Sequence, residues 1–181
     1  MNRTRILKLA VLAAAVLAAA APLAAQGLAP SPKTPAADGT VSPGEYSYTS
    51  AQKDMTVHLS LSADGGTLYA AVEAPTTGWV AIGLGSLKMD GAFLVLGYDA
   101  AGTQAVREDT GRGRAHAPNP TRVLTAQAVR ETTGKTVLEF ALPAAPHAAG
   151  SSLKLILAYG RRDDFTSIHA RYAPLEVPIS R

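Results

Sequence analysis

The fold is decided by the stretch Gly78-Trp-Val-Ala-Ile-Gly-Leu-Gly-Ser-Leu-Lys-Met-Asp-Gly-Ala-Phe-Leu-Val-Leu-Gly-Tyr98. It consists of two apolar runs around a short polar turn, and this turn carries Met89. Runs of this length, bounded by glycine and rich in Val, Ile, Trp and Tyr, are typical of buried β-strands. The second run, from Ala92 to Tyr98, is apolar almost throughout, as expected of a strand covered on both faces. The stretch therefore predicts two neighbouring strands with a methionine at the turn between them.

Similar strand patterns occupy most of the remaining sequence. Apolar and polar side chains alternate from Met55 to Leu61, which predicts a half-buried strand. Further strand patterns cover residues 68–72, 123–130, 136–142, 153–159 and 175–179. Two polar segments contain glycine or proline and predict loops, Glu108 to Pro120 and Gly160 to Arg171. Roughly nine short strands without helical periodicity predict an all-β fold, an antiparallel β-sandwich.

The N-terminal residues 1–25 have the pattern of a secretory signal peptide. Three cations precede an apolar run from Leu9 to Ala20, and small residues then favour cleavage after Ala25. The apolar run is too short for a membrane span. We therefore expect a periplasmic or secreted protein with a cleaved signal peptide.

The prediction for the rest of the chain is a linker followed by one domain. Residues 26–37 contain Pro30, Pro32 and Pro35 and predict a disordered Pro-rich linker. The folded domain is expected to span residues 38–181, a length that suffices for one hydrophobic core.

Charge and cysteine content exclude several functions. The chain has 17 Lys and Arg against 14 Asp and Glu, and the predicted signal peptide holds three of the cations, so the remainder is formally neutral. A neutral domain lacks the basic surface of a nucleic-acid-binding protein. The absence of cysteine excludes disulfides, thiolate metal sites and covalent haem attachment through Cys-x-x-Cys-His.

Several short motifs together resemble the DOMON domain across essentially all of residues 38–181. They are Asp38-Gly-Thr-Val-Ser-Pro-Gly-Glu-Tyr46, Gly78-Trp-Val-Ala-Ile-Gly83, Met89-Asp-Gly-Ala92, Gly97-Tyr-Asp99, and Ala158-Tyr-Gly160 followed by Asp163-Asp-Phe-Thr-Ser-Ile-His169. The resemblance implies an immunoglobulin-like β-sandwich that binds non-covalent haem b or, in other members, a sugar. In the haem-binding branch the iron lies between a methionine and a histidine, which match Met89 and His169. Many members carry an acidic residue where this chain has Phe93, which we expect to pack in the core.

Ligation by methionine and histidine suits a haem that passes electrons, because it leaves no open coordination position and the thioether raises the potential. The expected function is thus one-electron transfer to or from a redox partner, such as a membrane-associated or periplasmic oxidoreductase. The sequence has no Gly-x-Ser-x-Gly, His-Glu-x-x-His or phosphate-loop motif, so we expect no enzymatic activity of its own. Four loop arginines are candidate partners for haem propionates: Arg112, Arg114, Arg161 and Arg162.

Other interpretations of these residues remain open. Met89 is also explained as a gap-filling side chain, and His169 as a solvated loop residue. His116 lies in the polar segment and is an alternative ligand or a partner of a ligand. Trp79 and Tyr98 are either core aromatics or surfaces that stack on a porphyrin or a sugar ring. The alternative function is accordingly a carbohydrate- or ligand-binding β-sandwich module without haem.

Overall fold

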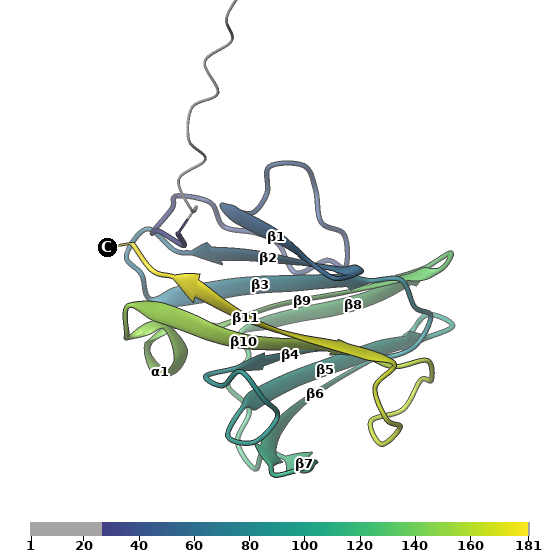
Figure 1. Ribbon diagram of the computed structural model, residues 1–181. Coiled ribbons are helices and arrows are strands. Elements are labelled where there is room, and N and C mark those ends of the chain that lie inside the picture. Colours follow the sequence, from purple (N-terminus) through teal and green to yellow (C-terminus); the bar gives the residue numbers. More distant parts are fainter. Residues whose placement is uncertain (1–26, 181) are drawn as a thin grey trace, which may run out of the picture.

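The computed structural model describes residues 27–180 and consists of two antiparallel β-sheets packed face to face (Figure 1). The first sheet contains, in spatial order, β1 (Tyr48–Gln52), β2 (Met55–Leu61), β3 (Thr67–Ala74), β9 (Lys135–Pro143) and β8 (Ala126–Thr132). The second contains β11 (Arg171–Pro178), β10 (Ser152–Tyr159), β4 (Val80–Leu84), β5 (Phe93–Ala100), β6 (Thr103–Arg112) and β7 (Ala115–Pro118). A short helix, α1 (Ala145–Ala148), joins β9 to β10. The predicted antiparallel β-sandwich is confirmed.

The predicted signal peptide, residues 1–25, lies outside the described residues. Within residues 27–180, no helix has the length and apolar character needed to cross a lipid bilayer.

The alternation of side chains along each strand builds the main core between the sheets. In β4, Val80, Ile82 and Leu84 point into this core, which also contains Phe140 of β9, a large and fully buried side chain. The opposite face of the second sheet carries a separate apolar cluster formed by Trp79, Ala81, Ala92, Leu94 and Leu96. The strand at β5 is therefore covered on both faces, which explains its nearly continuous apolar sequence.

The polar segment Glu108 to Pro120 is not the irregular loop predicted from its sequence. Most of it forms the hairpin of β6 and β7, in which Asp109 pairs with Pro118 and Arg112 with Ala115. Gly111 lies within a strand because another backbone passes close to it, and Gly113 has a φ of +59° in the hairpin turn. The glycines that suggested irregular structure thus have a packing role and a turn role.

The N-terminal segment also differs from its prediction as a disordered linker, because it packs against the sandwich. Leu28 is fully buried in the main core. Its N–H donates to the carbonyl of Pro178 at 2.8 Å, and its carbonyl accepts the N–H of Ser180 at 2.9 Å. Ser31 donates to the carbonyl of Leu61 at 3.0 Å. The segment therefore connects the end of β11, in one sheet, to the end of β2, in the other.

Candidate functional site

An apolar cleft of about 420 Å³ lies on the outer face of the second sheet. Its floor contains Ala81 of β4 and Ala158 of β10, which are register partners, and small side chains at both positions leave a hollow. The floor is completed by Leu94, Leu96 and Ile156. The walls come from the β4–β5 turn, the β6–β7 hairpin and the loop before β11, all of which border this face of the sheet in Figure 1. Further lining residues are Trp79, Leu87, Lys88, Met89, Gly113, Arg114, His116, His169 and Tyr172.

Met89 is half-buried in the β4–β5 turn, and this turn is hydrogen-bonded to the β6–β7 hairpin. The N–H of Gly91 donates to the carbonyl of Gly111 at 3.1 Å, and the N–H of Gly111 donates to the carbonyl of Ala92 at 2.9 Å. A Cβ atom at Gly111 would lie 1.8 Å from the carbonyl oxygen of Met89, so only glycine permits this approach. The turn that carries Met89 is therefore held by two backbone hydrogen bonds to Gly111 and by its close packing against that glycine.

Asp90 adds a third connection between the same turn and hairpin. Its Oδ1 accepts the backbone N–H of Gly113 at 2.8 Å, and Lys88 lies 3.5 Å from its Oδ2. The hydrogen bond from Gly113, and secondarily the charge of Lys88, lower the pKa of Asp90 below its ordinary value. The carboxylate is therefore charged, and able to hold the turn, throughout the neutral range.

His169 is exposed in the loop before β11, and the base of this loop is anchored to Trp79. The N–H of Gly160 donates to the carbonyl of Trp79 at 2.8 Å, and the Trp79 N–H donates to the carbonyl of Arg162 at 3.1 Å. The indole Nε1 also donates to Oγ of Ser167 at 2.9 Å. The His169 ring packs edge-on against Tyr172, with 5.1 Å between the ring centroids.

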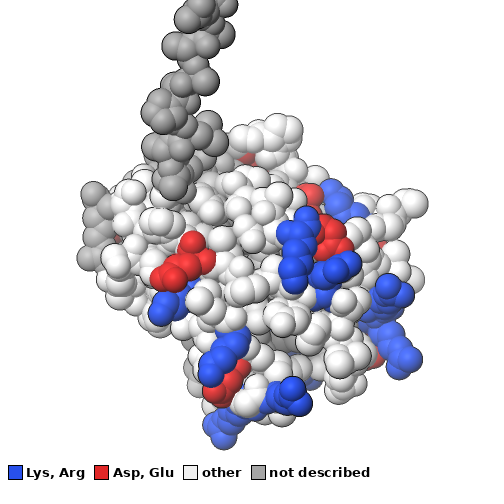
Figure 2. All heavy atoms as spheres, in the orientation of Figure 1, with Lys and Arg blue, Asp and Glu red and all other residues white. Residues whose placement is uncertain are grey.

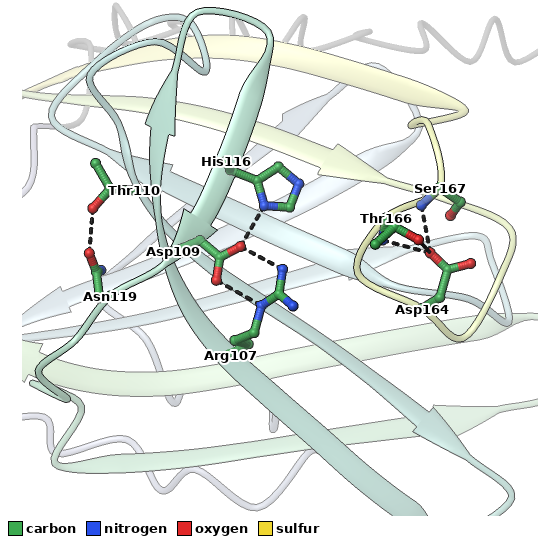
Figure 3. Close-up of polar contacts among 8 residues, drawn as sticks. All are labelled: Arg107, Asp109, Thr110, His116, Asn119, Asp164, Thr166 and Ser167. Atoms are coloured by element: carbon green, nitrogen blue, oxygen red, sulfur yellow. Dashed lines mark hydrogen bonds and ion pairs between the residues drawn. The ribbon is translucent and has the colours of Figure 1, made fainter.

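The interior of this loop is organised by Asp164 (Figure 3). Its Oδ1 accepts the backbone N–H groups of Thr166 at 2.7 Å and Ser167 at 2.5 Å. The hydrogen bond from Ser167, followed by that from Thr166, lowers the pKa of Asp164. A charged carboxylate therefore closes the turn that leads to His169.

His116 belongs to β7 and forms part of a buried polar cluster (Figure 3). Its Nδ1 lies 2.5 Å from Oδ2 of Asp109, a carboxylate whose side chain is 0% exposed. Arg107 donates to both oxygens of that carboxylate, from Nε and Nη2, at 2.7 Å each. The guanidinium of Arg107 lies 4.4 Å from the centroid of the Phe165 ring, so the cluster also touches the loop that carries His169.

Of the five site residues predicted from the sequence, four line the cleft: Met89, His169, His116 and Trp79. Trp79 is only 6% exposed. Tyr98 instead packs beside the cleft on Phe165, with 4.8 Å between ring centroids. Phe93 packs against the main core, as expected.

The sequence analysis did not identify Arg107, Asp109 and Phe165 as part of this region. Arg107, Asp109 and Gly111 alternate along one strand and therefore share a face. That spacing would have pointed to a polar cluster, but the strand itself was predicted as a loop.

Cationic side chains border the cleft. Lys88 and Arg114 line it, and Arg161 and Arg162 line an adjoining hollow of about 390 Å³ that also includes His169. On the face shown in Figure 2, Lys and Arg side chains gather toward the lower and right-hand parts, several with acidic neighbours. An apolar floor with a cationic border suits a flat apolar ligand that carries anionic groups.

Two solved structures resemble this fold. The cytochrome domain of Myriococcum thermophilum cellobiose dehydrogenase superposes with a TM-score of 0.58 and 13% identity, covering 74% of this chain and 81% of that chain. The cytochrome b domain of pyranose dehydrogenase from Coprinopsis cinerea gives a TM-score of 0.59 and 16% identity, covering 72% and 80%. No protein-family model and no curated protein sequence matches the chain. The similarity therefore defines the class of fold, the β-sandwich of these cytochrome domains.

Proposed function

We propose that this chain is a haem b-binding electron-transfer domain of the DOMON type, with Met89 and His169 as axial ligands. The observation that carries the proposal is that both side chains line one apolar cleft. They reach it from opposite ends of β4, because the Met89 turn follows Leu84 whereas the His169 loop follows Tyr159, the partner of Val80. A strand of this length spans roughly 13 Å. The apolar cleft is thus bordered by the thioether of Met89 and the imidazole of His169.

The bound haem would supply a reversible one-electron couple of its iron. Met89 would favour the reduced state because a thioether stabilises ferrous iron. Because Met89 and His169 would both hold the iron, substrate or oxygen would find no open position at the metal, and the domain would carry electrons without being an enzyme itself. The apolar floor would shield a bound porphyrin from water and thereby contribute to its potential.

The cations at the border of the cleft have two roles in this proposal. Arg114 and Lys88 are placed to pair with haem propionates, and Arg161 and Arg162 extend the positive surface next to His169. Both similar structures are named as cytochrome domains of dehydrogenases. We therefore propose a separate oxidoreductase as the redox partner, in the periplasm or outside the cell.

Haem reconstitution tests the proposal directly. The protein purified with haem should show a low-spin spectrum with sharp reduced bands and a haem b signature in the pyridine haemochrome assay. Met89→Ala should remove the near-infrared band of sulfur-bound ferric iron and lower the potential. His169→Ala should release haem or make it high spin.

A matched control is His147→Ala, because His147 stacks on Phe93 outside the cleft and its loss should leave the spectrum unchanged. A protein that binds no haem, or spectra unaltered in both ligand variants, would refute the assignment.

The alternative of a carbohydrate-binding module relied on Trp79 and Tyr98 as stacking surfaces. Trp79 is almost fully buried with its indole N–H engaged, and Tyr98 is packed against Phe165. Neither ring presents the open face that a sugar requires. A colourless protein whose melting temperature rises with added glycans would support this alternative instead.

A further inference from the structure

The cleft contains a second imidazole that the proposed pair of axial ligands does not use. His116 lines the same cleft as Met89 and His169, and its side chain is 22% exposed. The fully buried Asp109 binds its Nδ1, and Arg107 in turn binds Asp109 through two hydrogen bonds. Burying a carboxylate is costly unless it is paired, so this arrangement indicates a specific role for the ring that it holds.

Strand register places His116 beside Met89. His116 and Gly111 are directly paired between β7 and β6, so their Cβ directions lie on the same face of the sheet. A Cβ atom at Gly111 would lie 3.2 Å from Cγ of Met89. The side chains of Met89 and His116 therefore lie next to each other on one wall of the cleft.

The hydrogen bond to Asp109 determines which nitrogen of His116 is available. An ionised carboxylate only accepts hydrogen bonds, so in the neutral ring Nδ1 carries the hydrogen and donates it to Asp109, which leaves the lone pair on Nε2. Metal-binding histidines in proteins are oriented by this same kind of contact, with a carboxylate behind the ring. The bidentate contact from Arg107, itself covered by Phe165, fixes the carboxylate in turn.

We propose that His116 is a second axial ligand on the Met89 wall, which binds the haem iron through Nε2 when the methionine sulfur is not bound. This inference rests on the proposed haem-binding function. In the exchange an iron–sulfur bond would break and an iron–nitrogen bond would form from the neutral Nδ1–H ring, with no net transfer of electrons or protons. The site then has two low-spin states, and the state with two imidazoles has the lower potential because it lacks the thioether.

The test is the spin state of haem in variants of the full domain. Met89→Ala should remain six-coordinate and low spin, with the electron paramagnetic resonance signature of two imidazole ligands. Met89→Ala combined with His116→Asn should become high spin, since asparagine retains a donor toward Asp109 but lacks Nε2. The matched control is Met89→Ala with His147→Asn, which removes a histidine outside the cleft and should stay low spin.

A further variant tests the positioning role of Asp109. Asp109→Asn in the Met89→Ala background should weaken haem binding on the order of 10-fold and give a mixture of spin states. A high-spin Met89→Ala variant that retains haem, or a low-spin Met89→Ala/His116→Asn variant, would overturn the proposal while leaving Met89/His169 ligation intact.

Nuclear magnetic resonance of the haem-free protein provides an independent arm. Long-range ¹⁵N correlations should show His116 as the Nδ1–H tautomer, and observation of the Nε2–H tautomer would overturn the proposal whether or not haem binds. A wild-type protein that fails to take up haem would instead refute the proposed function, and this ligand assignment would fall with it.

Discussion

At the scale of single residues, Gly111 determines how closely the methionine turn approaches the β6–β7 hairpin. Its N–H and carbonyl both bond to the β4–β5 turn, and the Met89 carbonyl occupies the space where a side chain would begin. The carbonyl that a side chain here would meet belongs to the backbone, which cannot rotate away as a flexible side chain would. The identity of this one residue therefore affects both stability and the position of the sulfur.

Gly111→Ala should move the turn that carries Met89. We expect a loss of about 1–3 kcal/mol in the free energy of unfolding, because an inserted methyl group forces backbone shifts in a packed region. Urea denaturation measures this loss, and a weaker sulfur–iron band in the haem-loaded protein reports the displaced ligand. The control is Gly150→Ala, where the nearest atom to a new Cβ is 3.9 Å away. Equal stability of the two variants would contradict the prediction.

At the scale of elements, the loop before β11 is held by a few polar contacts and one aromatic contact. Asp164 closes its turn, Ser167 receives the indole N–H of Trp79, and Phe165 packs between Tyr98 and Arg107. No regular secondary structure supports His169 until β11 begins at Arg171. The placement of His169 therefore depends on side-chain contacts within the loop, together with the backbone hydrogen bonds at its base.

Asp164→Ala should loosen this loop without unfolding the sandwich. Faster amide exchange at Thr166 and Ser167 and weaker haem binding are expected, as measured by hydrogen exchange and haem titration. Asp163→Ala is the control, since this exposed neighbour has a carboxylate outside that network. The same loosening should occur in acid. The pKa of Asp164 is lower in the folded state than its ordinary value, so the stabilising contribution of the carboxylate is fully present above about pH 3.8 and is lost as the pH falls through the pKa of the folded state. Unchanged exchange in Asp164→Ala would refute this prediction.

Strands could be predicted from the sequence where burial of one face makes apolar and polar side chains alternate. They could not be predicted where polar contacts take the place of that burial. The alternation from Met55 to Leu61 and the apolar run from Ala92 to Tyr98 both identified strands, which became β2 and β5. β6 was missed because it carries Arg107 and Asp109, whose charges satisfy each other on the outer face. Local sequence does not show such pairing, since Asp109 also requires His116 from the next strand.

At the scale of the whole molecule, the N-terminal segment closes one end of the sandwich. Leu28 is in the main core, and its backbone bridges to Ile179, while Pro30 bridges to Leu61. The prolines of this segment predicted disorder, but one buried leucine and its backbone hydrogen bonds hold it in place. A domain boundary at Asp38, as predicted from the sequence, would therefore remove part of the core.

Leu28→Ala should destabilise the domain by about 2–5 kcal/mol, as is usual when a fully buried leucine is truncated and a cavity remains. A chain that begins at Asp38 should lose at least as much. Thermal and urea unfolding of the haem-free protein measure both effects. Val123→Ala is a suitable control, because Val123 is 38% exposed and should change stability by less than about 0.5 kcal/mol. A Leu28→Ala variant as stable as this control would show that the segment contributes little.

The cleft and the main core lie on opposite faces of the second sheet, and this separation bears on the order of assembly. The core is filled by the protein's own side chains, from Leu28 to Val177, so the polypeptide has no need of a prosthetic group to complete its interior. If the proposed function holds, folding would be completed first, and a porphyrin would then enter from the outside or leave again without unfolding the sandwich. The empty protein would accordingly be a stable, long-lived acceptor whose loading follows the local supply of haem.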